Sequence, residues 1–227
     1  MKPIFTKAMF EFLEELTANN DRDWFAENKS RYVECVQSPG LQLISDLIAP
    51  LRKVAPFIVA NPARSGGSMT RIYRDTRFAK DKTPYKTFVG MHLRHETGKD
   101  IHGPGIYLHF ALDECFVAAG CYLPESSVLA RIRAAINGDG KAWIKAREDR
   151  KFRENYSLWG DSLKTAPRDY PRTHPLIEDL KRKHFIGVSP LSRKEVLSVA
   201  LLPIIIERTK DARSFMRFLC ESIGVPY

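Results

Sequence analysis

Apolar residues recur at steps of three and four in the first third of the chain, and this spacing is typical of amphipathic helices. Thr6 is positioned to cap a first helix, and Asp21 to cap a second. Ser38, followed by a proline, predicts the start of a third helix, which we expect to end near Val54. Residues 61–68 have the composition of a loop.

The middle of the chain has a period of two. Apolar residues alternate with polar ones over 87–94 and over 105–112, whereas 115–123 is apolar on both faces. Alternation indicates strands with one buried face, and short connections favour antiparallel pairing. We expect 184–191 to add a further strand, and 69–74 to form a strand that leads into a basic segment.

The last hundred residues are mostly helical in pattern. Helices are predicted over 124–136 and 173–183, each with a proline near its start. Residues 192–195 match a capping box. No linker interrupts the chain, so we expect residues 1–227 to form a single α+β domain. Its antiparallel sheet of about four to six strands would lie in the middle of the chain, packed by N-terminal and C-terminal helices.

Composition narrows the class of protein. The chain has 227 residues, of which 44% are hydrophobic and 28% charged, as in soluble globular proteins. The four cysteines form no CxxC pair, which favours reduced thiols in a cytoplasmic protein. Acidic residues occur too early for a secretory signal, and the apolar run 199–206 is too short to span a bilayer. We therefore expect no membrane partner.

Positive charge is concentrated in one part of the chain. The formal net charge is +9, and the stretch from Arg64 to Arg94 holds eight basic residues against Asp75 and Asp81. Basic proteins tend to bind anions such as nucleic acid, acidic lipid or phosphorylated small molecules.

The basic segment is "RIYRDTRFAKDKTPYKT", residues 71–87. Arginine offers a planar fork of donors that matches phosphate or carboxylate oxygens. The predicted ligand-binding residues of this segment are Arg71, Arg74, Arg77, Lys80, Lys82, Tyr85 and Lys86. In an extended strand Arg71 and Arg74 lie on opposite sides, so the charges cannot all share one face. The alternative is a structural loop held by ion pairs such as Arg71–Asp75 or Asp81–Lys86.

A second group of candidates lies on the sheet. If Asp113 and Glu114 form a two-residue turn, Tyr107 faces Gly120 and His109 faces Ala118, which leaves a hollow beside large polar side chains. The predicted floor of this hollow consists of His92, Arg94, Tyr107, His109 and Tyr122. The alternative is that glycine lets the tyrosine ring pack flat beneath a helix that covers this face.

Candidates for proton transfer are His109, whose ordinary pKa is near neutrality, and then Asp75. Four of the six histidines fall at 92, 95, 102 and 109. Their spacing fits no standard metal motif, so we assign no metal ligands. The sequence indicates no particular cofactor and no oligomeric state.

Four stretches resemble a widespread family, catalogued as domain of unknown function 2461. They are "NNDRDWFAENKSRY" (19–32), "RIYRDTRFAKDKTPYKT" (71–87), "YLHF" (107–110) and "LKRKHF" (180–185). The resemblance runs in order from near Phe10 to near Leu219. It implies a soluble, single-domain protein with no established reaction, and therefore no catalytic residues to carry over.

Three functions are compatible with these observations. The first is binding of a small phosphorylated or carboxylated molecule through the basic segment, with enzymatic turnover left open. The second is binding of nucleic acid by the same basic residues, with aromatic residues available for stacking. The third is a structural or interaction protein in which the segment only stabilises the fold.

Overall fold

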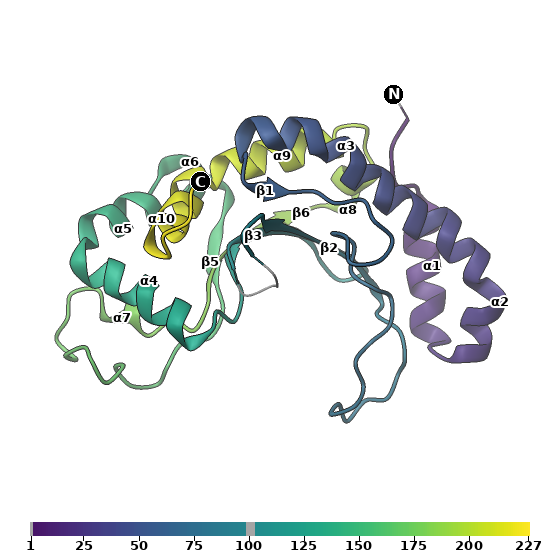
Figure 1. Ribbon diagram of the computed structural model, residues 1–227. Helices are drawn as coiled ribbons and strands as arrows, with labels where there is room; N and C mark the ends of the chain where they lie inside the picture. Colours follow the sequence, from purple (N-terminus) through teal and green to yellow (C-terminus); the bar gives the residue numbers. More distant parts are fainter. Residues whose placement is uncertain (1, 99–102) are drawn as a thin grey trace.

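The computed structural model describes residues 2–98 and 103–227 (Figure 1). The strands are β1 (Ile58–Val59), β2 (Phe88–His95), β3 (Gly105–Ala111), β4 (Cys115–Cys121), β5 (Ser157–Trp159) and β6 (Phe185–Leu191). The helices are α1 (Lys7–Ala18), α2 (Arg22–Tyr32), α3 (Ser38–Val54), α4 (Ser126–Gly138), α5 (Gly140–Arg147), α6 (Arg150–Asn155), α7 (Ile177–Leu180), α8 (Arg193–Val196), α9 (Leu201–Asp211) and α10 (Arg213–Ser222).

Within the described residues, six strands form one sheet in the order β1-β2-β3-β4-β6-β5, and every neighbouring pair is antiparallel. The predicted α+β class, with an antiparallel sheet and helices before and after it, is confirmed. Strands β2 to β4 form a meander, as their short connections predicted. Strand β6 returns from far along the sequence to pair with β4.

The N-terminal helices follow the predicted caps in part. Asp21 caps α2, because its Oδ1 accepts hydrogen bonds from the backbone N–H groups of Asp23 at 3.0 Å and Trp24 at 2.9 Å. Thr6 occupies the N-cap position of α1, although its side chain makes no capping hydrogen bond there.

Helix α3 runs from Ser38 to Val54 as predicted, but the prediction that Ser38 caps a separate helix is wrong. Helix α2 continues through a π-helical turn, Val33–Gln37, directly into α3. Pro39 lacks an N–H group and so removes a helical hydrogen bond, but the backbone before it stays helical, with φ −70° and ψ −51° at Gln37. The wider π turn accommodates the interruption of the hydrogen-bond ladder without ending the helix.

The C-terminal part differs from its prediction mainly in length. Helix α7 covers only four residues of the predicted 173–183, whereas α4 lies close to the predicted 124–136. The capping box is present: the Ser192 N–H donates to Glu195 Oε2 at 2.7 Å, and the Glu195 N–H donates to Ser192 Oγ at 3.2 Å.

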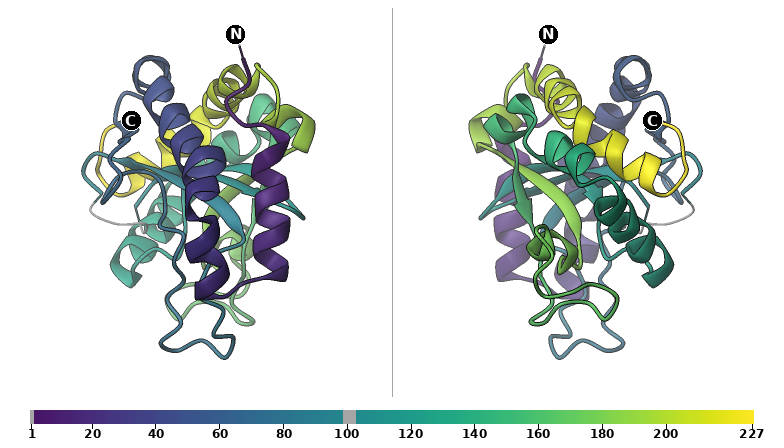
Figure 2. Two further views of the ribbon diagram at one scale, coloured as in Figure 1. Left: turned by 90° about the vertical axis from the view of Figure 1, so that its right-hand side faces the viewer. Right: turned by 90° about the vertical axis from the view of Figure 1, so that its left-hand side faces the viewer.

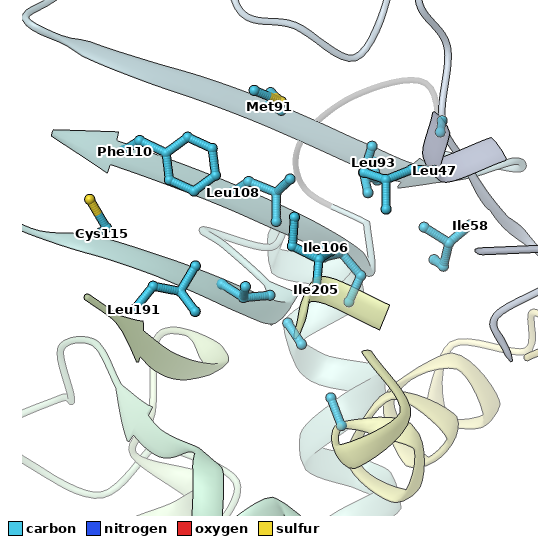
Figure 3. Close-up of a cluster of buried hydrophobic side chains, with 14 of the residues drawn as sticks. Leu47, Ile58, Met91, Leu93, Ile106, Leu108, Phe110, Cys115, Leu191 and Ile205 are labelled. Atoms are coloured by element: carbon cyan, nitrogen blue, oxygen red, sulfur yellow. The ribbon is translucent and has the colours of Figure 1, made fainter. Parts of the chain in front are cut away.

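The hydrophobic core lies between one face of the sheet and the helices packed on it. Met91, Leu93, Ile106 and Leu108 are fully buried on this face. They point toward α3 and α9, which contribute Leu47 and Ile205 to the same cluster (Figure 3). The core-facing residues of the strands are those that the period of two selected.

The opposite face of the sheet, called the open face here, has a different environment. Helices α3, α8 and α9 lie over the core face, while α1 and α2 stand at one end and α4, α5 and α7 at the other (Figures 1 and 2). None of the described helices covers the open face, so the molecule has the form of an arch with the sheet as its roof. Two long loops, one of them within residues 71–87, extend below the sheet at opposite sides.

The predicted strand over 69–74 is reduced to two isolated bridges, Met69 with Met91 and Tyr73 with Tyr85. At the second bridge the Arg74 N–H donates to Pro84 O, and the Lys86 N–H donates to Ile72 O, each at 2.8 Å. The proline has no N–H to extend this ladder. The chain between residues 75 and 83 therefore leaves the sheet as a loop.

No helix within the described residues is both long enough and apolar enough to cross a membrane.

Candidate functional site

A cavity of about 500 Å³ is hollowed into the open face. It is lined by Thr70, Lys86, Phe88, His92, Arg94, Gly105, Tyr107, Glu114, Phe116, Ala118, Ala119, Gly120, Tyr122, Trp159, Ile186 and Val188. Every strand of the sheet except β1 contributes to this lining. Strands β4 and β6 line the cavity together because their even-numbered residues are paired and therefore lie on the same face, the open face.

The hairpin between β3 and β4 does not have the predicted register. The Ala111 N–H donates to Glu114 O at 2.9 Å, so the two-residue turn is Leu112–Asp113. Tyr107 consequently faces Ala118, and His109 faces Phe116. Moving a turn by one residue changes the register by two, and a shift of two keeps each side chain on its face. The predicted residues therefore remain on the open face although their partners changed.

Two glycines on this face accommodate the rings of their neighbours. Tyr107 Oη lies 2.6 Å from the position that a Cβ on Gly90 would take, and His92 Nε2 lies 2.7 Å from that of Gly105. The Tyr107 hydroxyl thus occupies the space that a side chain at Gly90 would take, whereas Gly120, the predicted partner of Tyr107, pairs with Gly105. No described helix covers the face, however, and the cavity opens beside these rings over β4 and β6.

Arg94 is the basic side chain on the floor of the cavity. It is half-buried, and its Nε is buried without a hydrogen-bond partner among the described residues. The ion pairs found within residues 2–98 and 103–227 do not include Arg94. A guanidinium in this position has donors available to a ligand.

Lys86 lies at the other end of the cavity. Its Nζ donates to the backbone O of Arg71 at 2.8 Å, and it also lies near the ring of Phe88. Burial, with a smaller contribution from the charge of Arg71, lowers the pKa of Lys86 below its ordinary value. An anion at this end of the cavity would be favoured by the ammonium group and would in turn favour its charged form.

His109 is positioned by aromatic rings. Its imidazole stacks on Phe116 with centroids 4.8 Å apart, and the ring of Phe88 lies with its centroid 4.6 Å away at an interplanar angle of 32°. Burial lowers the pKa of His109, and Asp113 opposes this effect weakly. Tyr107 Oη lies 3.4 Å from His109 Nδ1, and burial raises the pKa of Tyr107 to about 12. Only Tyr107 of this pair is among the residues that line the cavity.

Most charges of the basic segment are used within the segment. Arg74 pairs with Asp81 at 2.5 Å and also bonds Thr83, whereas Arg77 holds Asp75 through two hydrogen bonds of 2.9 and 2.7 Å. These are not the ion pairs that the sequence suggested, which joined Arg71 to Asp75 and Asp81 to Lys86.

The remaining basic residues of the segment are more exposed. Lys82 donates to Thr76 O at 2.9 Å, and Arg71 and Lys80 are exposed. The structure therefore places Lys86 and Arg94 at opposite ends of one cavity, and leaves Arg71, Arg77, Lys80 and Lys82 away from its lining.

A second hollow of about 570 Å³ lies beside the first, and the two share Lys86 and Phe88. It is lined by Thr17, Asn20, Arg74, Asp75, Asp81, Thr83, Tyr85, Lys86, Thr87 and Phe88. Tyr85, predicted as a ligand-binding residue, is buried against Phe25 with ring centroids 4.1 Å apart. Asn20 clamps its backbone through two hydrogen bonds of 3.0 Å. Tyr85 therefore anchors the base of the basic segment.

Several lining residues could not be selected from the sequence. Trp159 belongs to a strand of three residues, which is too short to show a period, and Ile186 and Val188 occur in an apolar run. For Trp159 the local sequence offers little more than a tryptophan followed by a glycine, in "LWG".

No group of three or more histidine, cysteine, aspartate or glutamate side chains converges as a metal site within the described residues. His95 lies on the core face, where its Nδ1 is 2.7 Å from Thr97 Oγ1 and its Nε2 is 2.8 Å from Pro226 O. The candidate His102 lies outside the described residues.

Fold and cavity together define an α+β protein whose antiparallel sheet carries a basic and aromatic cavity on its open face. The sequence profile of the family described as "Conserved hypothetical protein (DUF2461)" matches residues 8–218. The chain belongs to this family, and the predicted resemblance is confirmed. No curated protein and no solved structure is significantly similar to the chain.

Proposed function

We propose that the cavity on the open face binds a small phosphorylated or carboxylated molecule, with Arg94 holding its anionic group. The observation that carries this proposal is Arg94, whose buried Nε has no hydrogen-bond partner among the described residues. Burying an unsatisfied polar atom of a charged group is costly, and a ligand oxygen would satisfy it.

The surroundings of Arg94 support a ligand with an apolar body. Phe116, Ala118, Ile186 and Val188 contribute apolar surface to the same cavity. Binding sites for small molecules typically combine such walls with a few polar groups that fix orientation. Exclusion of water by these walls would strengthen the attraction between the guanidinium and an anion.

The proposal concerns binding rather than turnover. His109 and Asp75 are the candidates for proton transfer, but neither is among the residues that line the cavity. Asp75 instead holds Arg77, whose hydrogen bonds lower the pKa of that carboxyl group to about 2.

The test is a calorimetric and thermal-shift titration of the full chain with inorganic phosphate, phenyl phosphate and phenylacetate. We expect saturable binding, which raises the Tm with ligand concentration. Arg94→Gln should lose most of this binding, with little change in the Tm without ligand. Arg77→Gln is the matched control, since it also removes one arginine but lies outside the cavity. Equal binding by the wild type and Arg94→Gln, or no binding by either, would overturn the proposal.

The second candidate is binding of single-stranded nucleic acid by the basic segment. The observation that favours it is Phe78, which is 94% exposed beside Arg77, with Tyr73 56% exposed in the same segment. Exposed aromatic rings among basic side chains are suited to base stacking and phosphate contact. Fluorescence anisotropy of a labelled oligothymidylate should then show salt-dependent binding that Phe78→Ala weakens and Arg94→Gln does not.

A further inference from the structure

Two large aromatic side chains are exposed at one edge of the cavity. Tyr122 and Trp159 are 40% and 53% exposed, and both line the cavity. Together with the buried His184 they form a cluster, called the aromatic wall here. The ring of Tyr122 stacks on His184 with centroids 5.2 Å apart and an interplanar angle of 21°, and Trp159 lies 6.5 Å from Tyr122. Ring faces left exposed beside a cavity are available to a ligand.

The backbone on both sides of the aromatic wall has unusual conformations. Leu123 has φ 43°, a left-handed conformation that is costly for a residue with a side chain, and its N–H donates to His184 Nδ1 at 3.1 Å. Gly160 has φ 111°, and a Cβ there would lie 2.8 Å from His184 Cβ. Such conformations persist where the surrounding structure enforces them, and they concentrate at ligand sites. The wall is therefore held in a defined position.

The sheet register relates the aromatic wall to Arg94. Arg94, Gly105, Gly120, Ile186 and Trp159 are successive partners across the strands β2, β3, β4, β6 and β5. Arg94 and Trp159 are thus four strand spacings apart, roughly 19 Å between Cα atoms. Both side chains line the cavity, and the two glycines between them, Gly105 and Gly120, leave its floor open to a ligand.

We propose that the ligand of this cavity carries a planar aromatic ring, which packs against the aromatic wall while the anionic group binds Arg94. This inference rests on the proposed function, because it assumes that Arg94 binds an anion. The required chemistry is an aromatic ring joined by a short spacer to a phosphate or carboxylate. A nucleoside monophosphate and an arylalkyl carboxylate both have it, so the test includes each.

The experiment compares acids that differ only in the ring. The first pair is 4-phenylbutanoate and 4-cyclohexylbutanoate, and the second is adenosine 5′-monophosphate and ribose 5-phosphate. We expect the aromatic member of at least one pair to bind about tenfold more tightly, as stacking contributions predict. The pair that shows the difference identifies the kind of ring.

Variants of the wall locate the effect. Tyr122→Leu/Trp159→Leu should abolish the preference for the aromatic acid over its non-aromatic partner. Tyr73→Leu, which removes an exposed tyrosine of the basic segment, is the matched control. Tyr122→Phe/Trp159→Phe should keep the preference. A preference that is lost in the leucine variant and kept in the phenylalanine variant is due to the aromatic rings. Of the three tryptophans only Trp159 lines the cavity, so quenching of tryptophan fluorescence that Trp159→Phe removes would report contact with the wall directly.

The outcomes separate this inference from the proposed function. If both members of each pair bind equally well and Arg94→Gln loses binding, the inference of an aromatic ring is overturned, while the proposal of anion binding stands. A preference that survives in Tyr122→Leu/Trp159→Leu would also overturn it. Absence of binding by all four acids and by inorganic phosphate would overturn the proposed function, and this inference with it.

Discussion

Arg74 and Asp81 face each other across the base of the basic segment, with Nη1 and Oδ2 2.5 Å apart. Asp81 also accepts hydrogen bonds from the N–H and the hydroxyl group of Thr83, each at 2.9 Å. An aspartate that organises the backbone two residues ahead is a common turn device. The charged groups of Arg74 and Asp81 therefore stabilise the conformation of the loop rather than a ligand site.

Removal of the Asp81 carboxylate should loosen the loop without unfolding the protein. Asp81→Ala deletes the bonds to Thr83 and to Arg74, yet this ion pair is partly exposed and contributes little to global stability. We expect faster proteolysis within residues 75–83 and a nearly unchanged Tm. Lys80→Ala, which removes an exposed charge from the same loop, is the control and should leave proteolysis unchanged. A large fall in Tm for Asp81→Ala would show that the loop supports the whole fold.

The same carboxylate predicts a pH dependence of the loop. The hydrogen bond from the Thr83 N–H, followed by those from Arg74 and the Thr83 hydroxyl, lowers the pKa of Asp81 to about 2 from 3.8. A lowered pKa means that the stabilisation is complete above pH 3.8 and is lost as the pH falls through about 2. Carbon-detected NMR titration of the Asp81 carboxyl group measures this directly, and a pKa near 3.8 would contradict the observed hydrogen bonds.

His109 should make the fold less stable in mild acid. Burial lowers its pKa below the ordinary value of 6.5, so the unfolded chain binds a proton at a higher pH than the folded protein does. The stability that the neutral imidazole confers is present above pH 6.5 and is lost as the pH falls through the lower folded pKa. His109→Phe should reduce the loss of unfolding free energy between pH 7 and 5, measured by urea denaturation. A pKa of 6.5 or more in an NMR titration of His109 would be the contrary result.

Gly120 is predicted to be irreplaceable at the cavity floor. Its φ is 132°, and a Cβ there would lie 2.0 Å from the backbone O of Phe185. Gly120→Ala should cost about 3 kcal/mol of unfolding free energy, since neither strand can move without breaking the sheet. Gly138→Ala is the control, because nothing lies within 4 Å of its Cβ position, and it should change stability by at most about 1 kcal/mol. Equal effects of the two substitutions in urea denaturation would refute the argument.

The strands and their faces were predictable from the sequence because the period of two is a property of neighbouring residues. Val89, Met91 and Leu93 are buried on the core face, as alternation requires. The pairing of Tyr107 was not predictable, since it depends on whether the turn begins at Leu112 or one residue later. Short-range composition does not decide between these turns, whereas packing of both strands in the sheet does.

The candidate site was predictable only in part for a similar reason. Arg94 and Tyr107 could be placed on one face from their parity, and both line the cavity. The opposite side of the cavity comes from β5 and β6, and no local pattern relates them to β2. The density of positive charge, in contrast, predicted Arg77 and Lys80 as ligand-binding residues. Both lie outside the cavity because their loop leaves the sheet after Arg74.

The strand order has a consequence for folding during synthesis on the ribosome. The meander β2 to β4 can form as soon as it emerges, but β6 and β5 complete the sheet only after much more of the polypeptide has been made. Since pairings between distant parts of the sequence form slowly, the sheet stays incomplete during much of synthesis. A nascent chain halted before Phe185 would contain Arg94 and the residues of the aromatic wall, but it would lack β6, which pairs β5 and Trp159 with the rest of the sheet. We therefore expect ligand binding only by the full-length protein.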